Sequence, residues 1–199
     1  MTTKTPQQFR RQNVKNLFDK ILKRGKTELI PLSIDISESI EDGLTTVNLS
    51  LTEKSYHSVK VKFLKDIKAK GYVDGLFKGL QEEYKESYPT LNRIKLIDLS
   101  VIPTIKKTSS VGSDAKTNVS LSVNVDQHGE AEFYHRSRSM VRSSFFAVLK
   151  AFEFYINCER TFVSLKNILE DAQSRNRGDI IQTCLLDLSK LTEVNTYEG

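Results

Sequence analysis

The order of segments along this chain repeats: three strand-like runs precede one helix-like run, and then the same order returns. In the first half, alternating apolar residues predict strands over 28–37, 45–52 and 56–64, followed by a helix over 73–86. In the second half, the same patterns predict strands over 93–104, 118–126 and 131–136, and a helix from about residue 139. A repeat of roughly 65–70 residues predicts an α+β fold of two βββα units related by an internal pseudo-two-fold.

The repeat divides the chain into four expected parts. These are a basic helical arm (1–26), a first βββα unit (27–91), a second unit (92–157) and a long C-terminal helical extension (158–199). Apolar residues recur at steps of seven along the second helix, and this spacing predicts packing against another helix. The two series are Val148, Tyr155, Phe162 and Leu169, and Leu149, Ile156 and Val163. After a break at 176–179, a short helix is expected over 180–191, with Cys184, Leu185 and Leu188 facing inward.

The positive charge is concentrated in the arm. Residues 1–26 carry eight Lys and Arg against Asp19 alone, a net charge of +7, so the rest of the chain carries −2 out of a total of +5. Such an arm can contact nucleic acid or an acidic partner, but it is more often the solvated face of an amphipathic helix. Because the chain has neither zinc-finger spacing nor an aromatic ribonucleoprotein motif, nucleic-acid binding is a low-weight alternative.

No catalytic constellation is visible in the sequence. The three histidines do not pair with Cys, Asp or Glu at a metal-ligand spacing, and there is no nucleophile elbow, P-loop or dinucleotide fingerprint. We therefore expect no metal and no cofactor. Two cysteines are too few for a disulfide framework and indicate reduced thiols in a cytoplasmic protein. No apolar run is long enough to cross a membrane.

Three junctions carry chemistry that a plain turn does not need. One opens the first helix, one lies between the first two strands of the second unit, and one opens the second helix at 137–140. The first two contribute the candidate effector-binding residues Gly71, Tyr72, Val73, Asp74 and Gly75, and Gly112, Ser113, Asp114 and Ala115. Unpaired N–H groups at a helix start can hold a carboxylate and an aspartate can hold an ammonium group, which together suit a free amino acid. The alternative is ordinary helix capping and a plain turn.

These two motifs resemble those of the C-terminal regulatory domain of 2-isopropylmalate synthase and citramalate synthase, over roughly residues 27–157. The first helix of that family opens with a Gly-Asn-Gly-Pro-Val-Asp-Ala-like stretch, which Ala69-Lys-Gly-Tyr-Val-Asp-Gly75 resembles. Its second unit carries Gly-Thr-Asp-Ala, and Gly112-Ser-Asp-Ala115 differs only in the hydroxyl residue. Asp98, in Leu-Ile-Asp-Leu, occupies a similar strand position. Lys70, Tyr72 and the entry Arg136-Ser-Arg-Ser139 depart from the family pattern.

The resemblance implies a stand-alone regulatory domain in branched-chain amino-acid biosynthesis. It implies a homodimer of two-unit chains that binds leucine, or another branched-chain amino acid, as an allosteric effector. Helix amides would take the carboxylate, an aspartate the ammonium group, and Tyr72 with Val73 would line the side-chain pocket. The segment from Phe145 to Leu169 would lie near the dimer axis or against the arm. The synthase barrel is absent, so no catalysis is expected, and the regulated partner would be a separate synthase subunit. The alternative is a protein-interaction module that has lost effector binding.

Overall fold

The computed structural model describes residues 5–56, 58–104 and 116–197. This part of the chain forms two three-stranded antiparallel sheets and four α-helices, which confirms the α+β prediction. Sheet A contains β1 (Glu28–Ser39), β2 (Leu44–Ser55) and β3 (Ser58–Ala69), and sheet B contains β4 (Ile94–Thr104), β5 (Lys116–Val125) and β6 (Glu130–Ser137). The helices are α1 (Pro6–Ile21), α2 (Tyr72–Tyr84), α3 (Met140–Ser174) and α4 (Gly178–Thr192).

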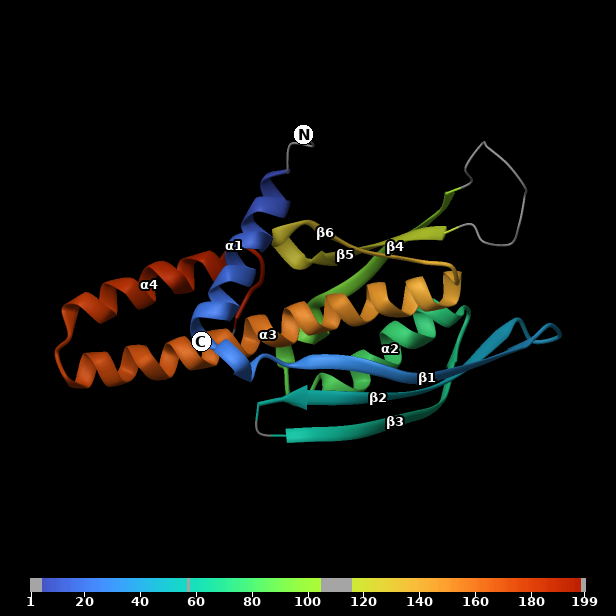
Figure 1. Ribbon diagram of the computed structural model, residues 1–199, viewed down its shortest axis with the longest axis horizontal. Coiled ribbons are helices and arrows are strands. Elements are labelled where there is room, and N and C mark those ends of the chain that lie inside the picture. Colours follow the sequence, from blue (N-terminus) through green and yellow to red (C-terminus); the bar gives the residue numbers. More distant parts are fainter. Residues whose placement is uncertain (1–4, 57, 105–115, 198–199) are drawn as a thin grey trace.

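The two sheets lie on opposite sides of α2 and α3 (Figure 1). Helix α2 packs on β2 and β3, helix α3 packs on β5 and β6, and the two helices contact each other. The rings of Phe77 and Phe152 meet edge to face at 5.1 Å in that contact. The inward rows of the two central strands are almost fully buried, and they consist of Val47, Leu49 and Leu51 in β2 and Val119, Leu121, Val123 and Val125 in β5. One core therefore spans both units.

The first strand of each sheet carries an irregularity at a corresponding place. In β1 the register shifts between Pro31 and Ser33, and in β4 it shifts between Leu96 and Asp98. Leu32 and Ile97, the residues without a ladder partner, are 65 positions apart, within the repeat length that the sequence predicts. Pro31 is tolerated because β1 is an edge strand, where a missing N–H breaks no pairing to a further strand.

The arm is a packed helix. Thr5 and Gln8 form a capping box at its start, and Pro6 occupies the first turn, where its missing N–H costs nothing. The buried face consists of Val14, Leu17 and Phe18, and the Phe18 ring lies 5.6 Å from that of Phe154 in α3. The segment after Phe145 therefore packs on the arm within one chain.

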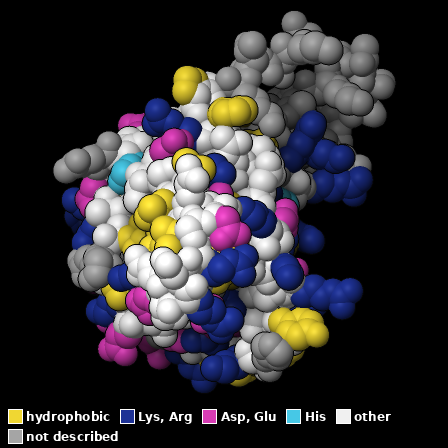
Figure 2. Space-filling view, turned by 90° about the vertical axis from the view of Figure 1, so that its left-hand side faces the viewer, with side chains coloured by type: hydrophobic (Ala, Val, Ile, Leu, Met, Phe, Trp, Pro, Cys, Tyr) yellow, Lys and Arg dark blue, Asp and Glu magenta, His cyan; other side chains and the backbone are white. Residues whose placement is uncertain are grey.

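Helix α3 runs without a break through residue 157, the expected boundary between the second unit and the C-terminal extension, as the seven-residue series predicts. Helix α4 folds back against the second half of α3 (Figure 1). The first members of the predicted seven-residue series, from Val148 to Ile156, are buried, but Val163 is 51% exposed because α3 has by then passed the end of sheet B. The inward prediction for Leu185 was wrong, since it is 52% exposed. Figure 2 looks onto the end of this hairpin, where a hydrophobic patch is visible and charged side chains lie beyond its border.

Candidate functional site

Helices α2 and α3 begin at the same end of the molecule (Figure 1). The hydroxyl groups of Tyr72, at the start of α2, and Ser144, in the second turn of α3, lie 2.9 Å apart and form a hydrogen bond. Thr104 and Lys116 pair at the adjoining ends of β4 and β5, which flank the segment 105–115. The fold therefore brings together the first and third junctions that the sequence singles out.

The backbone at the start of α2 is open to an anion. Gly71 is the N-cap residue, its backbone is extended, and no side chain caps the helix. The first intrahelical bond runs from the Gly75 N–H to the Gly71 carbonyl at 2.9 Å. Within the described part of the chain, the N–H groups of Tyr72, Val73 and Asp74 have no partner. Such orphan donors, with the positive end of the helix dipole, favour a bound anion.

The side chains of this first motif have other neighbours. Val73 is 7% exposed and belongs to the core, and a Cβ on Gly75 would meet a methyl group of Val47 at 3.0 Å, so glycine permits close packing of α2 on β2. Asp74 accepts a hydrogen bond from Lys78 one turn later, at 2.7 Å. Of the five residues, Tyr72, Val73 and Asp74 therefore offer open N–H groups to a ligand, and the half-exposed Asp74 carboxylate is already shared with Lys78. The second motif, Gly112 to Ala115, lies outside the described residues.

A groove of about 400 Å³ separates β1 from the first turns of α3. One wall is formed by Pro31, Leu32, Ser33 and Ile34, and the other by Ser139, Val141, Arg142, Phe145 and Phe146. Its volume falls within the range of small-molecule sites. The sequence indicates the junction at Ser139 but not the β1 wall, because no local pattern tells which strand of another unit a helix start will face.

The groove combines an apolar lining with a cation. Ser139 caps α3 by accepting a hydrogen bond from the Arg142 N–H at 3.2 Å. The Arg142 guanidinium lies 5.5 Å from the centre of the Phe146 ring, and that ring stacks on His135 at 4.5 Å. Burial, with Lys150 and Arg142 nearby, holds the pKa of His135 below its usual value, so the imidazole is neutral at pH 7. An amphipathic molecule with a carboxylate group matches this lining.

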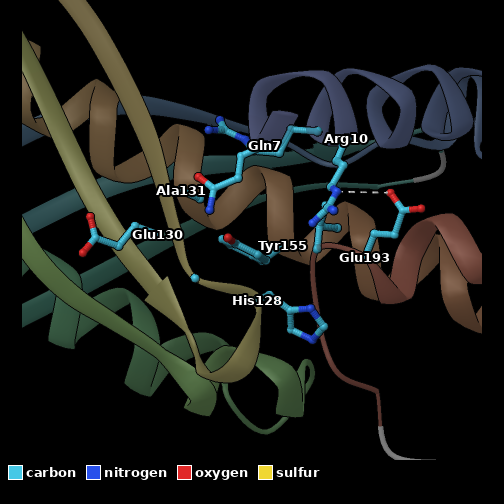
Figure 3. Close-up of a pocket in the computed structure, with 10 residues that line it drawn as sticks. Gln7, Arg10, His128, Glu130, Ala131, Tyr155 and Glu193 are labelled. Carbon is cyan, nitrogen blue, oxygen red and sulfur yellow. Dashed lines mark ion pairs between the residues drawn. The ribbon is translucent and has the colours of Figure 1, made fainter. Parts of the chain in front are cut away.

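Two other hollows involve the arm. The cavity in Figure 3 measures only about 20 Å³, enough for one water molecule. An ion pair between Arg10 and Glu193 (3.8 Å) and a hydrogen bond between the His128 Nε2 atom and the Thr196 hydroxyl (2.9 Å) lie beside it. A groove of about 350 Å³ between α1, β6 and α3 contains Arg11, Lys15, Lys150, Glu132 and Glu153 among its lining. The contacts around the small cavity hold α1 against the rest of the chain, and the larger groove is lined by side chains of both charges.

Much of the basic arm is already engaged within the chain. Arg11 stacks 4.1 Å above the Phe133 ring and donates to the Glu132 carbonyl, and Lys20 pairs with the buried Asp187 at 2.6 Å. Lys26 pairs with Asp19. These contacts leave fewer cations for a nucleic acid than the sequence alone indicates.

Within the described residues, no group of three His, Cys, Asp or Glu side chains could hold a metal ion. Cys158 and Cys184 are free thiols, both buried, and burial raises the pKa of each. In the same residues, no helix combines the length and apolar character that a membrane span requires. No family model and no curated protein matches this chain.

Proposed function

We propose that this protein is a non-catalytic regulatory domain that binds a branched-chain amino acid, leucine by preference. In this proposal its two βββα units are related by an internal pseudo-two-fold, as in the regulatory domain of 2-isopropylmalate synthase, and the chain acts as a homodimer on a separate synthase. The observation that carries the proposal is the convergence of two helix starts beside an apolar groove that holds one arginine. The corresponding bulges of β1 and β4 support the duplication.

Each part of the amino acid has a chemical counterpart. A carboxylate is attracted by the Arg142 guanidinium in the groove and by the orphan amides at the start of α2. A branched aliphatic side chain fits against Leu32, Ile34 and Phe145 in the groove. The ammonium group needs an anion, and the proposal assigns this role to Asp74 or Asp114.

Thermal denaturation of the full chain with leucine, isoleucine or valine tests the proposal. Ligand at a hundred times its Kd adds about 2.7 kcal/mol of stability, which corresponds to roughly 5–10 °C in Tm for a chain of this size. Two truncated analogues separate the contacts: 4-methylpentanoate lacks the ammonium group and isoamylamine lacks the carboxylate. If all three amino acids at millimolar concentration leave Tm unchanged and give no calorimetric heat, effector binding is refuted.

Single substitutions locate the site. Arg142→Ala and Asp114→Asn should each abolish the leucine shift, and Asp74→Asn should weaken it, with the unliganded protein still folded. Arg24→Ala is the matched control, because Arg24 is exposed beyond the far end of α1. Leucine binding that survives all three substitutions would place the effector elsewhere.

Two contacts favour the alternative function, a protein-interaction module without an effector. The Tyr72 side chain lies between the two helix starts and bonds to Ser144, and Asp74 is paired with Lys78. Both contacts occupy groups that a ligand would use. This alternative predicts no shift with any amino acid and co-purification with a protein partner.

A further inference from the structure

The outer face of sheet A, which points away from the helices, is unusually apolar. Two cross-strand rows define it: Ile30, Thr52 and Val61, and Ser33, Ser50 and Phe63. Val59 extends it along β3. The four apolar members are between 41% and 67% exposed: Ile30 41%, Val61 51%, and Val59 and Phe63 67%. We refer to Ile30, Thr52, Val59, Val61 and Phe63 as the outer patch.

The orientation of β3 explains why this patch exists. Lys62 faces the helices, where it pairs with Glu83 of α2 at 2.5 Å and lies 4.7 Å from the Tyr84 ring. Because side chains alternate along a strand, Val61 and Phe63 on either side of Lys62 must face away. The strand thus has a charged inner residue fixed by specific contacts and a row of apolar outer residues.

The outer face of sheet B has a different composition. Its third strand, β6, presents Glu130, Glu132 and Tyr134 outward, opposite Asn124, Ser122 and Ser120 of β5. The corresponding outward residues of β3 are Val59, Val61 and Phe63, opposite Lys54, Thr52 and Ser50. At the third strand, therefore, sheet A presents three apolar residues outward, whereas sheet B presents two glutamates and a tyrosine. A solvated face does not require apolar residues, whereas a covered face does.

We propose that the outer patch is the surface through which two copies of this chain pair face to face about a two-fold axis. This inference rests on the homodimer in the proposed function and names its surface. A second copy fits because the patch carries little net charge: Glu28 and Lys54 at its end neutralise each other at 3.8 Å. A nucleic acid or an anionic membrane would need an excess of cations here, and a strongly charged protein would find no complement.

The shape and size of the face also suit self-association. The central strand carries the small residues Ser50 and Thr52 between Ile30 on β1 and the apolar residues of β3. An apolar row of one copy can therefore pack over the smaller central residues of the other. Three strands of 12 residues cover roughly 14 by 40 Å. That whole outer face measures about 560 Å² before side-chain relief is counted, or about 70% of the roughly 800 Å² per partner of a standard interface.

Light scattering after gel filtration and sedimentation equilibrium of the full chain test the inference. The wild-type chain should be a dimer at micromolar concentration. Val61→Glu and Phe63→Glu should each raise the dimer dissociation constant at least a hundredfold, because each places two unpaired carboxylates in the interface. Tyr134→Glu, a matched change on the outer face of sheet B, should leave the dimer intact. Val61→Thr, which keeps a β-branched residue, should weaken the dimer without unfolding the sheet, and circular dichroism checks the fold of every variant.

A proximity measurement covers the case in which the glutamate variants fail to fold. Thr52→Cys, at the centre of the patch, should be captured as a covalent dimer by a short bismaleimide, since Cys158 and Cys184 are buried and react poorly. A monomeric wild-type chain, or a dimer that survives Val61→Glu and gives no crosslink at residue 52, overturns the inference. Leucine titrations of the wild-type chain and of Val61→Glu separate the two proposals. If Val61→Glu is monomeric and leucine leaves the Tm of the wild-type chain unchanged, the outer patch is supported as the dimer surface and effector binding is refuted.

Discussion

Glu153 is predicted to make the stability of this protein fall as the pH rises. The carboxyl lies in the groove between α1, β6 and α3, and burial raises its pKa from the usual 4.5 to about 7. Lys15 and Lys150 oppose this effect only in part, and a hydrogen bond from the Leu29 N–H does the same. The folded state therefore binds more protons than the unfolded state between these pH values, so the free energy of unfolding decreases across that window. At 1.36 kcal/mol for each pKa unit, the loss is about 3 kcal/mol.

Glu153→Gln removes the ionisable group and keeps an acceptor for the Leu29 N–H. The variant should be more stable than wild type by about 3 kcal/mol at pH 8, or roughly 6–12 °C in Tm, and should differ little at pH 4, where the carboxyl is protonated in both states. Urea unfolding at several pH values measures the difference. Glu170→Gln, an exposed change on the same helix, is the control. A Glu153→Gln effect of equal size at pH 4 and pH 8 would refute the titration argument.

Two further predictions concern polar contacts between helices. Asp187 is 3% exposed and accepts hydrogen bonds from Lys20 of α1 at 2.6 Å and from Lys190 at 2.7 Å. Asp187→Asn should therefore lower the free energy of unfolding in urea by about 1.5–3 kcal/mol at pH 7. The difference should shrink on acidification, because these lysines lower the pKa of Asp187 against the opposing effect of its burial. An unchanged urea midpoint would mean that the hydrogen bonds from the two lysines do not contribute to stability. Tyr72→Phe removes the hydrogen bond to Ser144 and should cost about 1 kcal/mol by the same assay, whereas equal stability would show that solvent replaces it.

The sequence pattern predicts the elements of this fold well but not which face of each is covered. Alternation places Val61 and Phe63 on one face of β3, and they do share one, but it is the outer face because Lys62 is held by Glu83 of α2. Likewise, the helical pattern expects Cys184 and Leu185 inward on α4; Cys184 is buried, but Leu185 is 52% exposed and the charged Asp187 is buried instead. A buried charge depends on a partner distant in sequence, and hydrophobic periodicity does not detect such pairs.

The candidate site could be predicted in part for a similar reason. The repeated order of elements fixes where each helix starts, and the two starts do meet at Tyr72 and Ser144. The groove beside them also needs β1, whose approach to Arg142 depends on how the two units pack. Local sequence carries no information on that packing.

Helix α3 is long enough to connect the groove with the opposite end of the molecule. A helix of 35 residues measures about 52 Å, and this one begins in the groove at Ser139 and ends where α4 turns back. A tilt of about 3° pivoting at its first turn would displace the far end by nearly 3 Å over that length. Helix α4 and the arm would move with it, because both pack on α3. A small tilt at the groove end of α3 would therefore become a displacement of several ångströms at the end that carries α4.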